Sequence, residues 1–414
     1  MDHAVSESWI AEFPARLAQL AQQHQLRQRR VVVPQGGAYL SVDGERLLAF
    51  CSNDYLGLAQ HPALIGAACD GAQRYGVGAG ASPLVSGHSA ANDALEQSLA
   101  RFVGLPRALY FYAGFSTNTG VVPALVGKGD AIFSDALNHA CLIDGARLSG
   151  AQVHRFAHAD LSDLAAHLAA STAPRKLILS DAVFSMDGAV ADVAGLVALA
   201  ERFDALLLLD DAHGFGVLGP QGRGALAQCG LTAANASPRV LYMATLGKAA
   251  GVAGAFVAGS APLIDWLLQS TRSYVFATAA PAMLAVALGA SLELIEQGDH
   301  LRAHLYRLIE QLRCGLTAQL AGSGWQLGAS TTAIQPLLIG ENNAAMAVMH
   351  GLRQRGLWVP AIRPPTVAPG TARLRIALSA AHTSADVDRL VAALSDMAAH
   401  QLAHCASRAA AVPR

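Results

Sequence analysis

One lysine of this chain occupies a position where a reactive amine would be useful. The sequence has three lysines, and two of them fit structural roles: Lys128 lies in a glycine-containing turn and Lys176 precedes an apolar run. Lys248 instead follows the short apolar segment 240–243 and has small and apolar neighbours in sequence, without an acid. Such surroundings favour the neutral amine, the form that attacks carbonyl carbons. Lys248 is therefore the candidate for covalent chemistry, with a structural loop lysine as the alternative.

A carboxylate and an imidazole precede this lysine in the chain. Asp210 ends the uninterrupted apolar run 205–209, and His213 follows it three residues later. In pyridoxal phosphate (PLP) enzymes a lysine binds the aldehyde of the cofactor and an acid faces its ring nitrogen. Asp210, His213 and Lys248 together therefore predict a PLP site.

The segment 112–118 could hold the phosphate of such a cofactor. It joins a predicted strand to a predicted helix, and Gly114 and Phe115 stand at the junction. The free backbone N–H groups at the start of a helix bind anions. The alternative is an ordinary helix cap supplied by Ser116 or Thr117.

Other motifs give weaker signals. His139 follows a strand end, where an imidazole could lie on an aromatic cofactor or simply be structural. His154 and His158 have no third ligand at a familiar spacing, so we predict no metal site. Ser185 lacks the flanking glycines of a hydrolase nucleophile, and a hydrogen-bonding role is preferred. The glycines of segment 76–82 follow a predicted helix where a dinucleotide-binding motif needs a strand.

The elements that must position these residues alternate between short apolar and longer amphipathic segments. The predicted strands are residues 108–111, 131–133, 152–156, 177–179, 205–209, 240–243 and 254–258, and the helices between them include 115–125, 142–149, 161–170 and 193–202. This alternation predicts a mostly parallel seven-stranded sheet covered by helices on both faces. Ligands in such folds bind at the carboxyl ends of the strands, where the candidate residues fall.

Length and pattern indicate more than one domain. At 414 residues the chain exceeds a usual single core. From about Pro281 the pattern changes to long helices at 283–297 and 300–320, followed by strand, helix and strand. We expect an N-terminal arm and small-domain segment (1–58), a large cofactor-binding domain (59–290) and a smaller α+β C-terminal domain (291–414).

Composition excludes several classes of function. The formal net charge is −1 and the only dense basic run is Arg27-Gln28-Arg29-Arg30, so no nucleic-acid partner is expected. No apolar stretch approaches the roughly 20 residues of a membrane span. The start of the chain, Met1 to Ala4, lacks the order of a secretory signal, and the cysteines are dispersed, Cys405 being the last. We therefore expect a cytoplasmic enzyme with free thiols.

Taken together, these segments resemble the α-oxoamine synthases, PLP enzymes that condense an amino acid with an acyl thioester and release carbon dioxide. The similarity covers nearly the whole chain. It is carried by Ser52 to Leu58, Ser134 to His139, Val183 to Gly188, Asp210 to Gly216, Thr245 to Lys248 and Ile362 to Val367. The resemblance implies an aminotransferase-like fold of type I.

The resemblance also implies roles at the cofactor. Lys248 would hold the aldehyde, Asp210 the ring nitrogen, and His213 with Ser185 the ring hydroxyl. His139 would stack on the ring and face the substrate. These implied contacts make Lys248, His139, Asp210 and His213 the catalytic set.

The phosphate and the second subunit would be linked. Thr245, with the backbone of Gly114 and Phe115, would hold the phosphate, and Thr278 matches a position that reaches the phosphate of the other subunit. A homodimer with shared active sites is therefore implied.

For the substrates, the resemblance implies that Asn53 and Arg363 position the carboxylate of the amino acid, while Arg27 and Thr366 face the acyl substrate. The segment 362–367 and the residues after Asp210 look most like the members that condense L-alanine with pimeloyl-CoA or a pimeloyl-carrier protein in biotin synthesis. A sister synthase that uses glycine and a short acyl-CoA is the alternative. A binding module without turnover and a nicotinamide dehydrogenase are less favoured.

Two positions depart from the family pattern. Pro83 stands where relatives often carry arginine, and Cys141 where serine is usual. Neither position is expected to touch a proposed catalytic atom.

Overall fold

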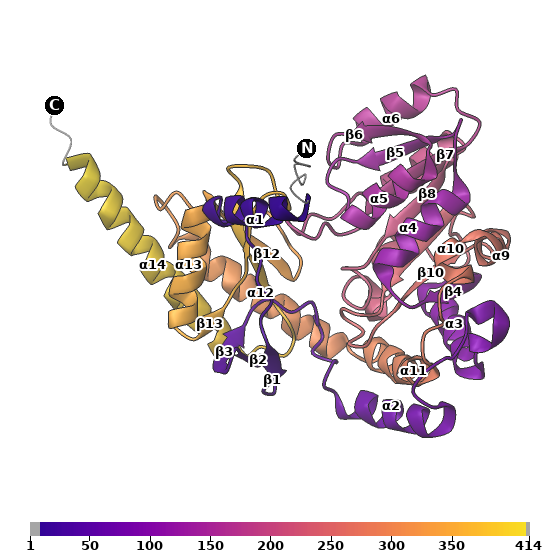
Figure 1. The fold of residues 1–414 in the computed structure, drawn as a ribbon, viewed down its shortest axis with the longest axis horizontal. Coiled ribbons are helices and arrows are strands. Elements are labelled where there is room, and N and C mark those ends of the chain that lie inside the picture. Colours follow the sequence, from indigo (N-terminus) through magenta and orange to yellow (C-terminus); the bar gives the residue numbers. More distant parts are fainter. Residues whose placement is uncertain (1–8, 411–414) are drawn as a thin grey trace, which may run out of the picture.

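The computed structural model describes residues 9–410, which form two lobes (Figure 1). The larger lobe is built on a seven-stranded sheet in the order β4-β10-β9-β8-β7-β5-β6, whose strands all run parallel except β10. The strands are β4 (Arg107–Phe111), β5 (Ala131–Asp135), β6 (Gln152–Phe156), β7 (Lys176–Asp181), β8 (Leu206–Asp210), β9 (Val240–Thr245) and β10 (Ala255–Gly259). The predicted mostly parallel seven-stranded sheet is confirmed.

Helices cover both faces of this sheet because its strands are apolar on both sides. Along β8, Leu208 packs into the core formed with α4 and α5, whereas Leu207 and Leu209 pack into the opposite core with α3, α6, α7 and α11. The helices of this lobe are α2 (Pro62–Tyr75), α3 (Ala90–Val103), α4 (Gly114–Leu125), α5 (Ala140–Ser149), α6 (Leu161–Ala170), α7 (Val193–Arg202), α8 (Ala225–Gln228), α9 (Ala261–Ser270), α10 (Arg272–Val275) and α11 (Ala282–Glu296). Parallel strands require this two-sided cover.

Polar side chains start several of these helices. Asp160 and Asp192 accept hydrogen bonds from backbone N–H groups in the first turns of α6 and α7. Ser89 and Asn92 form a reciprocal capping box at the start of α3. These local signals explain why the predicted bounds of α6 and α7 agree with the structure.

The smaller lobe is built from N-terminal and C-terminal segments of the chain. One four-stranded sheet has the order β1-β2-β3-β13, and a second has the order β11-β12-β15-β14. Their strands are β1 (Val32–Pro34), β2 (Tyr39–Val42), β3 (Glu45–Ala49), β11 (Gln326–Leu327), β12 (Ile334–Gly340), β13 (Leu357–Trp358), β14 (Ala361–Ile362) and β15 (Ala372–Ala377); its helices are α1 (Glu12–Gln22), α12 (Asp299–Thr317), α13 (Asn342–Gln354) and α14 (Ser384–Ala410). Because β3 pairs with β13, the N-terminal strands share a sheet with C-terminal ones. The domain limits at residues 58 and 290 stay a prediction.

Two further sequence expectations can be compared with this structure. Among residues 9–410 no helix is both long and apolar enough to cross a membrane. The five cysteines with described side chains, from Cys51 to Cys314, carry free thiols. Met1 to Ala4 and the side chain of Cys405 lie outside the described residues.

Candidate active site

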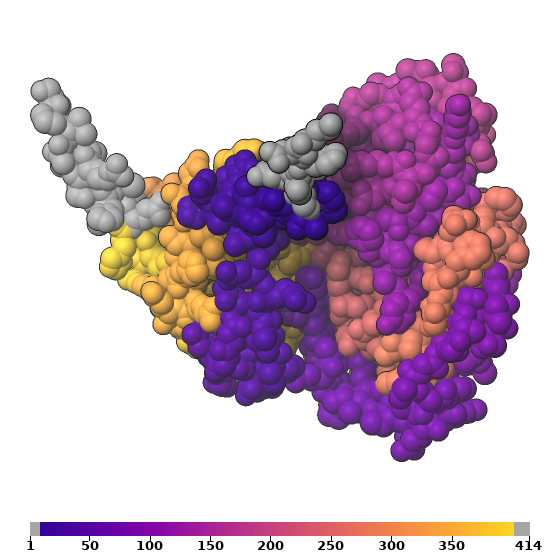
Figure 2. Space-filling view, viewed as in Figure 1, coloured from indigo at the N-terminus to yellow at the C-terminus, as the bar shows by residue number. Residues whose placement is uncertain are grey.

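The candidate residues meet in a cavity of about 200 Å³ at the carboxyl ends of the strands of the large sheet. The space-filling view shows the surface hollowed between the two lobes (Figure 2). The cavity is lined by Gly114, Phe115, His139, Cys141, Asp181, Asp210, Ala212, His213, Met243, Thr245 and Lys248. The structure thus brings together seven residues predicted from the sequence: Gly114, Phe115, His139, Asp210, His213, Thr245 and Lys248.

Lys248 lies in a tight turn that follows β9. The Gly251 N–H donates to the Lys248 carbonyl oxygen at 2.8 Å, and Gly251 has a φ of +70°. A Cβ added there would lie 2.7 Å from the Ala59 backbone nitrogen, so the turn needs glycine. The turn fixes the lysine at the cavity.

Burial lowers the pKa of the Lys248 ammonium, while the carboxylates of Asp210 and Asp181 favour the charged form. The sequence expectation of a lysine without acids nearby is therefore correct for its chain neighbours but wrong in space. Because burial is the largest effect, the amine loses its proton more readily than an exposed lysine does.

A hydrogen-bond chain leads from Lys248 to the second lobe. Lys248 Nζ lies 2.9 Å from His213 Nε2, and His213 Nδ1 lies 2.6 Å from the Tyr55 hydroxyl. The Tyr55 hydroxyl donates to Asn53 Oδ1 at 3.1 Å, and Arg375 Nη1 donates to the same oxygen at 3.2 Å. Burial, followed by the charge of Lys248, lowers the pKa of His213 well below its ordinary value, so the imidazole is neutral. It therefore accepts at one nitrogen and donates at the other.

Asp210 and its neighbour Asp211 face different surroundings. Asp210 Oδ1 accepts from the Ala212 N–H at 3.0 Å, and its side chain lines the cavity. Asp211 accepts instead from the Tyr242 hydroxyl and the Ala225 N–H, at 2.8 and 2.7 Å. Burial raises the pKa of Asp211 to about 7. Asp210 is thus the carboxylate available to a ligand in the cavity.

His139 caps the helix that carries Cys141. Its imidazole Nδ1 accepts from the Cys141 backbone N–H at 3.2 Å and lies 2.9 Å from Cys141 Sγ, so the expectation that Cys141 touches no catalytic atom is wrong. The backbone N–H of His139 donates to Asp181 Oδ2 at 2.6 Å. Asp181 pairs in register with Asp210 across β7 and β8. Burial and then the charge of Asp210 raise the pKa of Asp181 well above its ordinary value, so this second carboxyl group at the cavity resists ionisation.

The start of α4 is open to an anion. Ala113 caps this helix without a side-chain hydrogen bond, and the hydroxyls of Ser116 and Thr117 donate to the Ala113 carbonyl oxygen. The alternative of a Ser or Thr cap is therefore wrong. Gly114 leaves room beside Thr245, because an added Cβ would lie 3.5 Å from the Thr245 hydroxyl oxygen and 3.2 Å from the Met243 methyl carbon. Free N–H groups and a nearby hydroxyl suit a phosphate.

The residues that line the cavity therefore fit PLP. A primary amine, a buried carboxylate and an uncapped helix start line one space. These are the groups that bind an aldehyde, a ring nitrogen and a phosphate.

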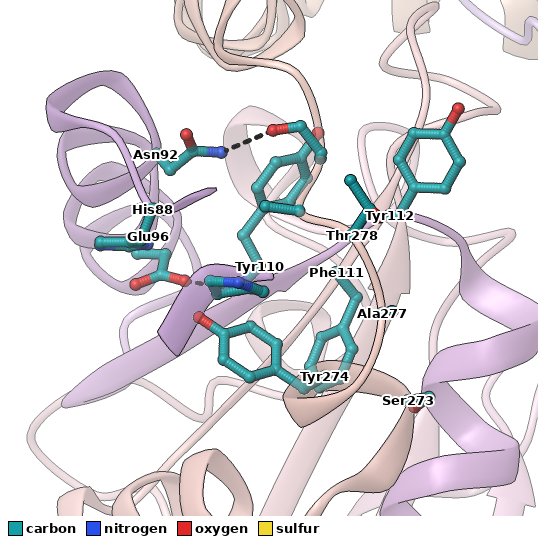
Figure 3. Close-up of a pocket in the computed structure, with 13 residues that line it drawn as sticks. His88, Asn92, Glu96, Tyr110, Phe111, Tyr112, Ser273, Tyr274, Ala277 and Thr278 are labelled. Carbon is teal, nitrogen blue, oxygen red and sulfur yellow. Dashed lines mark hydrogen bonds between the residues drawn. The ribbon is translucent and has the colours of Figure 1, made fainter. Parts of the chain in front are cut away.

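Other predicted residues lie outside this cavity. Ser185 contacts the C-terminal lobe, since its carbonyl oxygen accepts from Arg375 Nε at 2.6 Å. Thr278 lines a different cavity with Glu96, Tyr110 and Tyr274 (Figure 3). The roles of Ser185 and Thr278 stay predictions.

The residues predicted for the substrates divide into two groups. Arg27 Nη2 donates to the Thr366 hydroxyl at 3.4 Å, and Arg363 donates to the carbonyl oxygen of His24, so these three lie together beside the N-terminal segment. Burial and the charge of Arg27 lower the pKa of Arg363. Asn53, by contrast, lies with Arg375 and Tyr55 on the hydrogen-bond chain to Lys248.

Sequence reasoning missed Arg375, Tyr55, Asn118 and Asp181. Arg375 is buried in β15, where a charged residue alternates with Leu374 and Ile376. Local pattern gave no signal for this burial, because alternation of charged and apolar residues along a strand usually indicates a polar side that faces solvent. Asp181 ends a strand beside Asp210, and Asn118 lies one helical turn after Gly114, so strand register and helix period could have indicated both.

The two histidines considered for a metal have other contacts. His154 stacks on Phe133, with ring centroids 5.2 Å apart, and His158 Nδ1 lies 3.0 Å from Asp135 Oδ1. Within the described residues, no group of three or more His, Cys, Asp or Glu side chains could hold a metal ion.

Comparison with known proteins defines the class. A family model described as aminotransferase class I and II matches residues 45–394, and the chain belongs to this family. Within it, the chain is 74% identical over 394 residues to 8-amino-7-oxononanoate synthase 1 of Polaromonas sp., covering 95% of this chain and 97% of the relative. It is 72% identical over 391 residues to 8-amino-7-oxononanoate synthase of Paracidovorax citrulli, covering 94% and 95%. The resemblance to the α-oxoamine synthases is confirmed.

Solved structures agree with the type I fold. Serine palmitoyltransferase from S. paucimobilis with a bound PLP-myriocin aldimine has a TM-score of 0.88 and 26% identity, covering 96% of this chain and 100% of that chain. The crystal structure of 8-amino-7-oxononanoate synthase from Francisella tularensis has a TM-score of 0.73 and 28% identity, covering 86% and 98%.

Proposed function

We propose that the protein is a PLP-dependent acyltransferase that condenses L-alanine with a pimeloyl thioester, giving 8-amino-7-oxononanoate, carbon dioxide and a free thiol in biotin synthesis. One observation carries the proposal: the buried amine of Lys248, the carboxylate of Asp210 and the open start of α4 line one cavity in a chain with such close relatives. When bound, PLP would supply an aldehyde for the amino group of alanine and a ring that stabilises negative charge at the α-carbon.

The residues around Lys248 move and hold protons. Lys248 Nζ, whose pKa is lowered by burial, would take the α-proton of alanine. His213 Nε2, 2.9 Å away, orients that amine. The Asp210 carboxylate stabilises a proton on the ring nitrogen by charge and hydrogen bonding.

The carboxylate of alanine needs a cation near this cavity. Arg375, held against Asn53 and the Ser185 carbonyl oxygen, is the nearest arginine on the hydrogen-bond chain from Lys248. Arg363 remains the predicted partner from the family resemblance, and it contacts the N-terminal segment in this structure. Fixing the carboxylate selects which bond at the α-carbon breaks.

The acyl substrate is predicted to bind at Arg27 and Thr366. Their hydrogen bond places a guanidinium and a hydroxyl together beside Arg363.

We propose a homodimer with shared active sites, located in the cytoplasm. Large apolar side chains are exposed near Thr278: Phe276 is 70% exposed and Val85 79% exposed. Tyr112 and Thr278 both line the cavity of Figure 3. Exposed apolar residues gathered in this way indicate a surface that a partner covers.

The test is carbon dioxide release with alanine, glycine and serine, each combined with pimeloyl and acetyl thioesters. We expect alanine with the pimeloyl thioester to give the highest kcat/KM. Equal or better turnover of glycine with acetyl-CoA would favour the sister synthase instead. Binding of PLP without turnover of any pair would indicate the non-enzymatic alternative.

A further inference from the structure

Asn118 contacts two residues of the active site from a fully buried position in α4. Its Nδ2 donates to Asp210 Oδ2 at 2.6 Å and to Cys141 Sγ at 3.2 Å. Its Oδ1 is buried and has no hydrogen-bond partner among the described residues. Both amide hydrogens are therefore used, and turning the amide over would place Oδ1 against the Asp210 carboxylate.

The contact with Cys141 continues to His139. Burial raises the pKa of the Cys141 thiol to about 12, so the thiol keeps its proton. Because Sγ accepts from Asn118, the S–H is free to donate to His139 Nδ1, which lies 2.9 Å away. The Cys141 N–H donates to the same nitrogen.

These donors fix the tautomer of His139. Burial lowers the pKa of His139, so the imidazole is neutral. With Nδ1 accepting, the proton resides on Nε2, and His139 offers a donor through that nitrogen.

Close packing of two helices makes the chain of contacts possible. An added Cβ on Gly145 in α5 would lie 2.7 Å from the Asn118 carbonyl oxygen. Glycine thus lets α5, which carries Cys141, approach α4 at Asn118. Helix α4 begins at Gly114 and carries Asn118, which contacts Asp210. It therefore sets the distance between the proposed phosphate-binding start of the helix and the Asp210 carboxylate.

We infer that Asn118 is a positioning residue that orients two functional side chains at once, Asp210 directly and His139 through the thiol of Cys141. The inference rests on the proposed function for the roles of Asp210 and His139. It concerns the hydrogen-bond network and not the choice of substrate.

The first test measures PLP affinity and the pH dependence of the visible absorption of the bound cofactor, without acyl substrate. Asn118→Ala should weaken PLP binding about 10- to 100-fold, as expected for a lost hydrogen bond to a charged group. It should also shift the pH titration of the absorption band. Val122→Ala is the matched control, because Val122 is buried on α4 one turn after Asn118 and packs against Gly145 of α5 but offers no hydrogen bond to the active site. That control should leave both readouts unchanged.

Asn118→Asp keeps the size of the side chain and serves if Asn118→Ala does not fold. A second carboxylate facing Asp210 should weaken PLP binding at pH 8, with recovery as the pH is lowered and the new acid regains a proton to donate. Wild-type affinity and titration in either folded variant would overturn the inference.

The second test separates the direct contact of Asn118 with Asp210 from its indirect contact with His139 through Cys141. Cys141→Ser keeps a donor to His139 and should behave as the wild type. Cys141→Ala should keep PLP affinity within about twofold but raise KM for alanine about tenfold, since His139 loses an orienting donor. Identical kinetics in both Cys141 variants would overturn the His139 branch. A wild-type protein that binds PLP but turns over no substrate would contradict the proposed function and leave the Asn118 binding test valid.

Discussion

Lys248 combines two opposing electrostatic effects in one side chain. Burial lowers its pKa, whereas Asp210 and Asp181 act in the other direction. Asp181 weakens that opposition because burial and the charge of Asp210 raise its own pKa well above the ordinary value. The balance favours an amine that can lose its proton and regain it during one reaction cycle.

Lys248→Ala should therefore abolish turnover and covalent attachment of PLP. The mutant should lose the visible absorption of the attached cofactor, while the phosphate and ring contacts keep weak binding. Borohydride reduction of the wild type followed by peptide mass mapping should place the cofactor on the peptide that contains Lys248. Lys176→Ala is the matched control, because Lys176 Nζ donates to the Phe203 carbonyl oxygen away from the cavity. Label on Lys128 or Lys176 would contradict the assignment.

Asp210→Asn keeps the shape of the side chain but removes its charge. We expect exchange of the alanine α-proton to fall about 100-fold, since each 1.36 kcal/mol of lost transition-state stabilisation costs tenfold in rate. Exchange followed by NMR in deuterated water, without acyl substrate, isolates this step. Near-normal exchange would mean that another residue faces the ring nitrogen; Asp211 is a poor candidate because it is held by Tyr242 and Ala225.

Among single residues, the sequence predicted those that stand at strand ends, and in the structure these residues line one cavity. Lys248, Asp210 and His139 each follow an apolar run, so local pattern was sufficient. Arg375 could not be found in this way, because its contact with Asn53 joins residues 322 positions apart. Such a contact depends on the tertiary fold, which brings N-terminal and C-terminal parts of the chain together.

The carboxyl group of Glu96 on α3 is buried against β4, and no described residue forms an ion pair with it. Glu96 Oε1 accepts from the Tyr110 N–H at 2.8 Å, and Figure 3 shows its carboxylate at the cavity beside His88 and Tyr110. Burial raises the pKa of Glu96 to about 7. The folded protein thus binds the proton more tightly than the unfolded chain does.

This difference predicts a pH dependence of stability. A raised folded pKa means that the contribution of Glu96 to stability is complete below the unfolded value of about 4.3 and is lost as the pH rises through about 7. Glu96→Gln keeps an oxygen for the Tyr110 N–H and cannot ionise. It should raise stability at pH 8 by on the order of 1–3 kcal/mol relative to the wild type, with the difference shrinking toward pH 5.

Thermal unfolding from pH 5 to 8 measures this effect. Glu310→Gln, at an exposed position on α12, is the control and should leave the curve unchanged. A constant difference between Glu96→Gln and the wild type at all pH values would show that Glu96 does not titrate in this range.

Helices and strands were predicted correctly where hydrophobic periodicity or a helix cap gave a local signal. They were missed where a strand forms only by pairing with a segment far away in the sequence. The strand 152–156 and the helices 161–170 and 193–202 were predicted with their observed bounds. The two-residue strand β13 has too few residues for a periodic signal, and its parallel pairing with β3 joins Leu357 to Leu48. That pairing is set by the tertiary fold rather than by local propensity.

At the scale of the whole molecule, Thr278 and Lys248 line separate cavities of one chain. If Thr278 contacts the phosphate in the other subunit, each active site takes Lys248 from one chain and Thr278 from its partner. Thr278→Asp should then repel the phosphate only in the partner's site. This arrangement makes the activity of mixed dimers predictable.

Mixing inactive Lys248→Ala with impaired Thr278→Asp subunits should restore activity. In a mixed dimer, the Lys248 of the Thr278→Asp chain meets the intact Thr278 of the Lys248→Ala chain, so one of the two sites is complete. Random exchange at equal amounts forms mixed dimers in about half of the molecules, which predicts about a quarter of wild-type activity for a twofold-symmetric dimer.

The matched control mixes Lys248→Ala with Asp210→Asn. Lys248 and Asp210 line the same cavity of one chain, so no arrangement of these subunits gives an intact site and activity should stay at baseline. Recovery in the control would mean that the cavity is itself shared between chains. Absence of recovery with Thr278→Asp, in mixtures shown by native mass spectrometry to contain mixed dimers, would place the contribution of Thr278 within its own chain or outside the reaction.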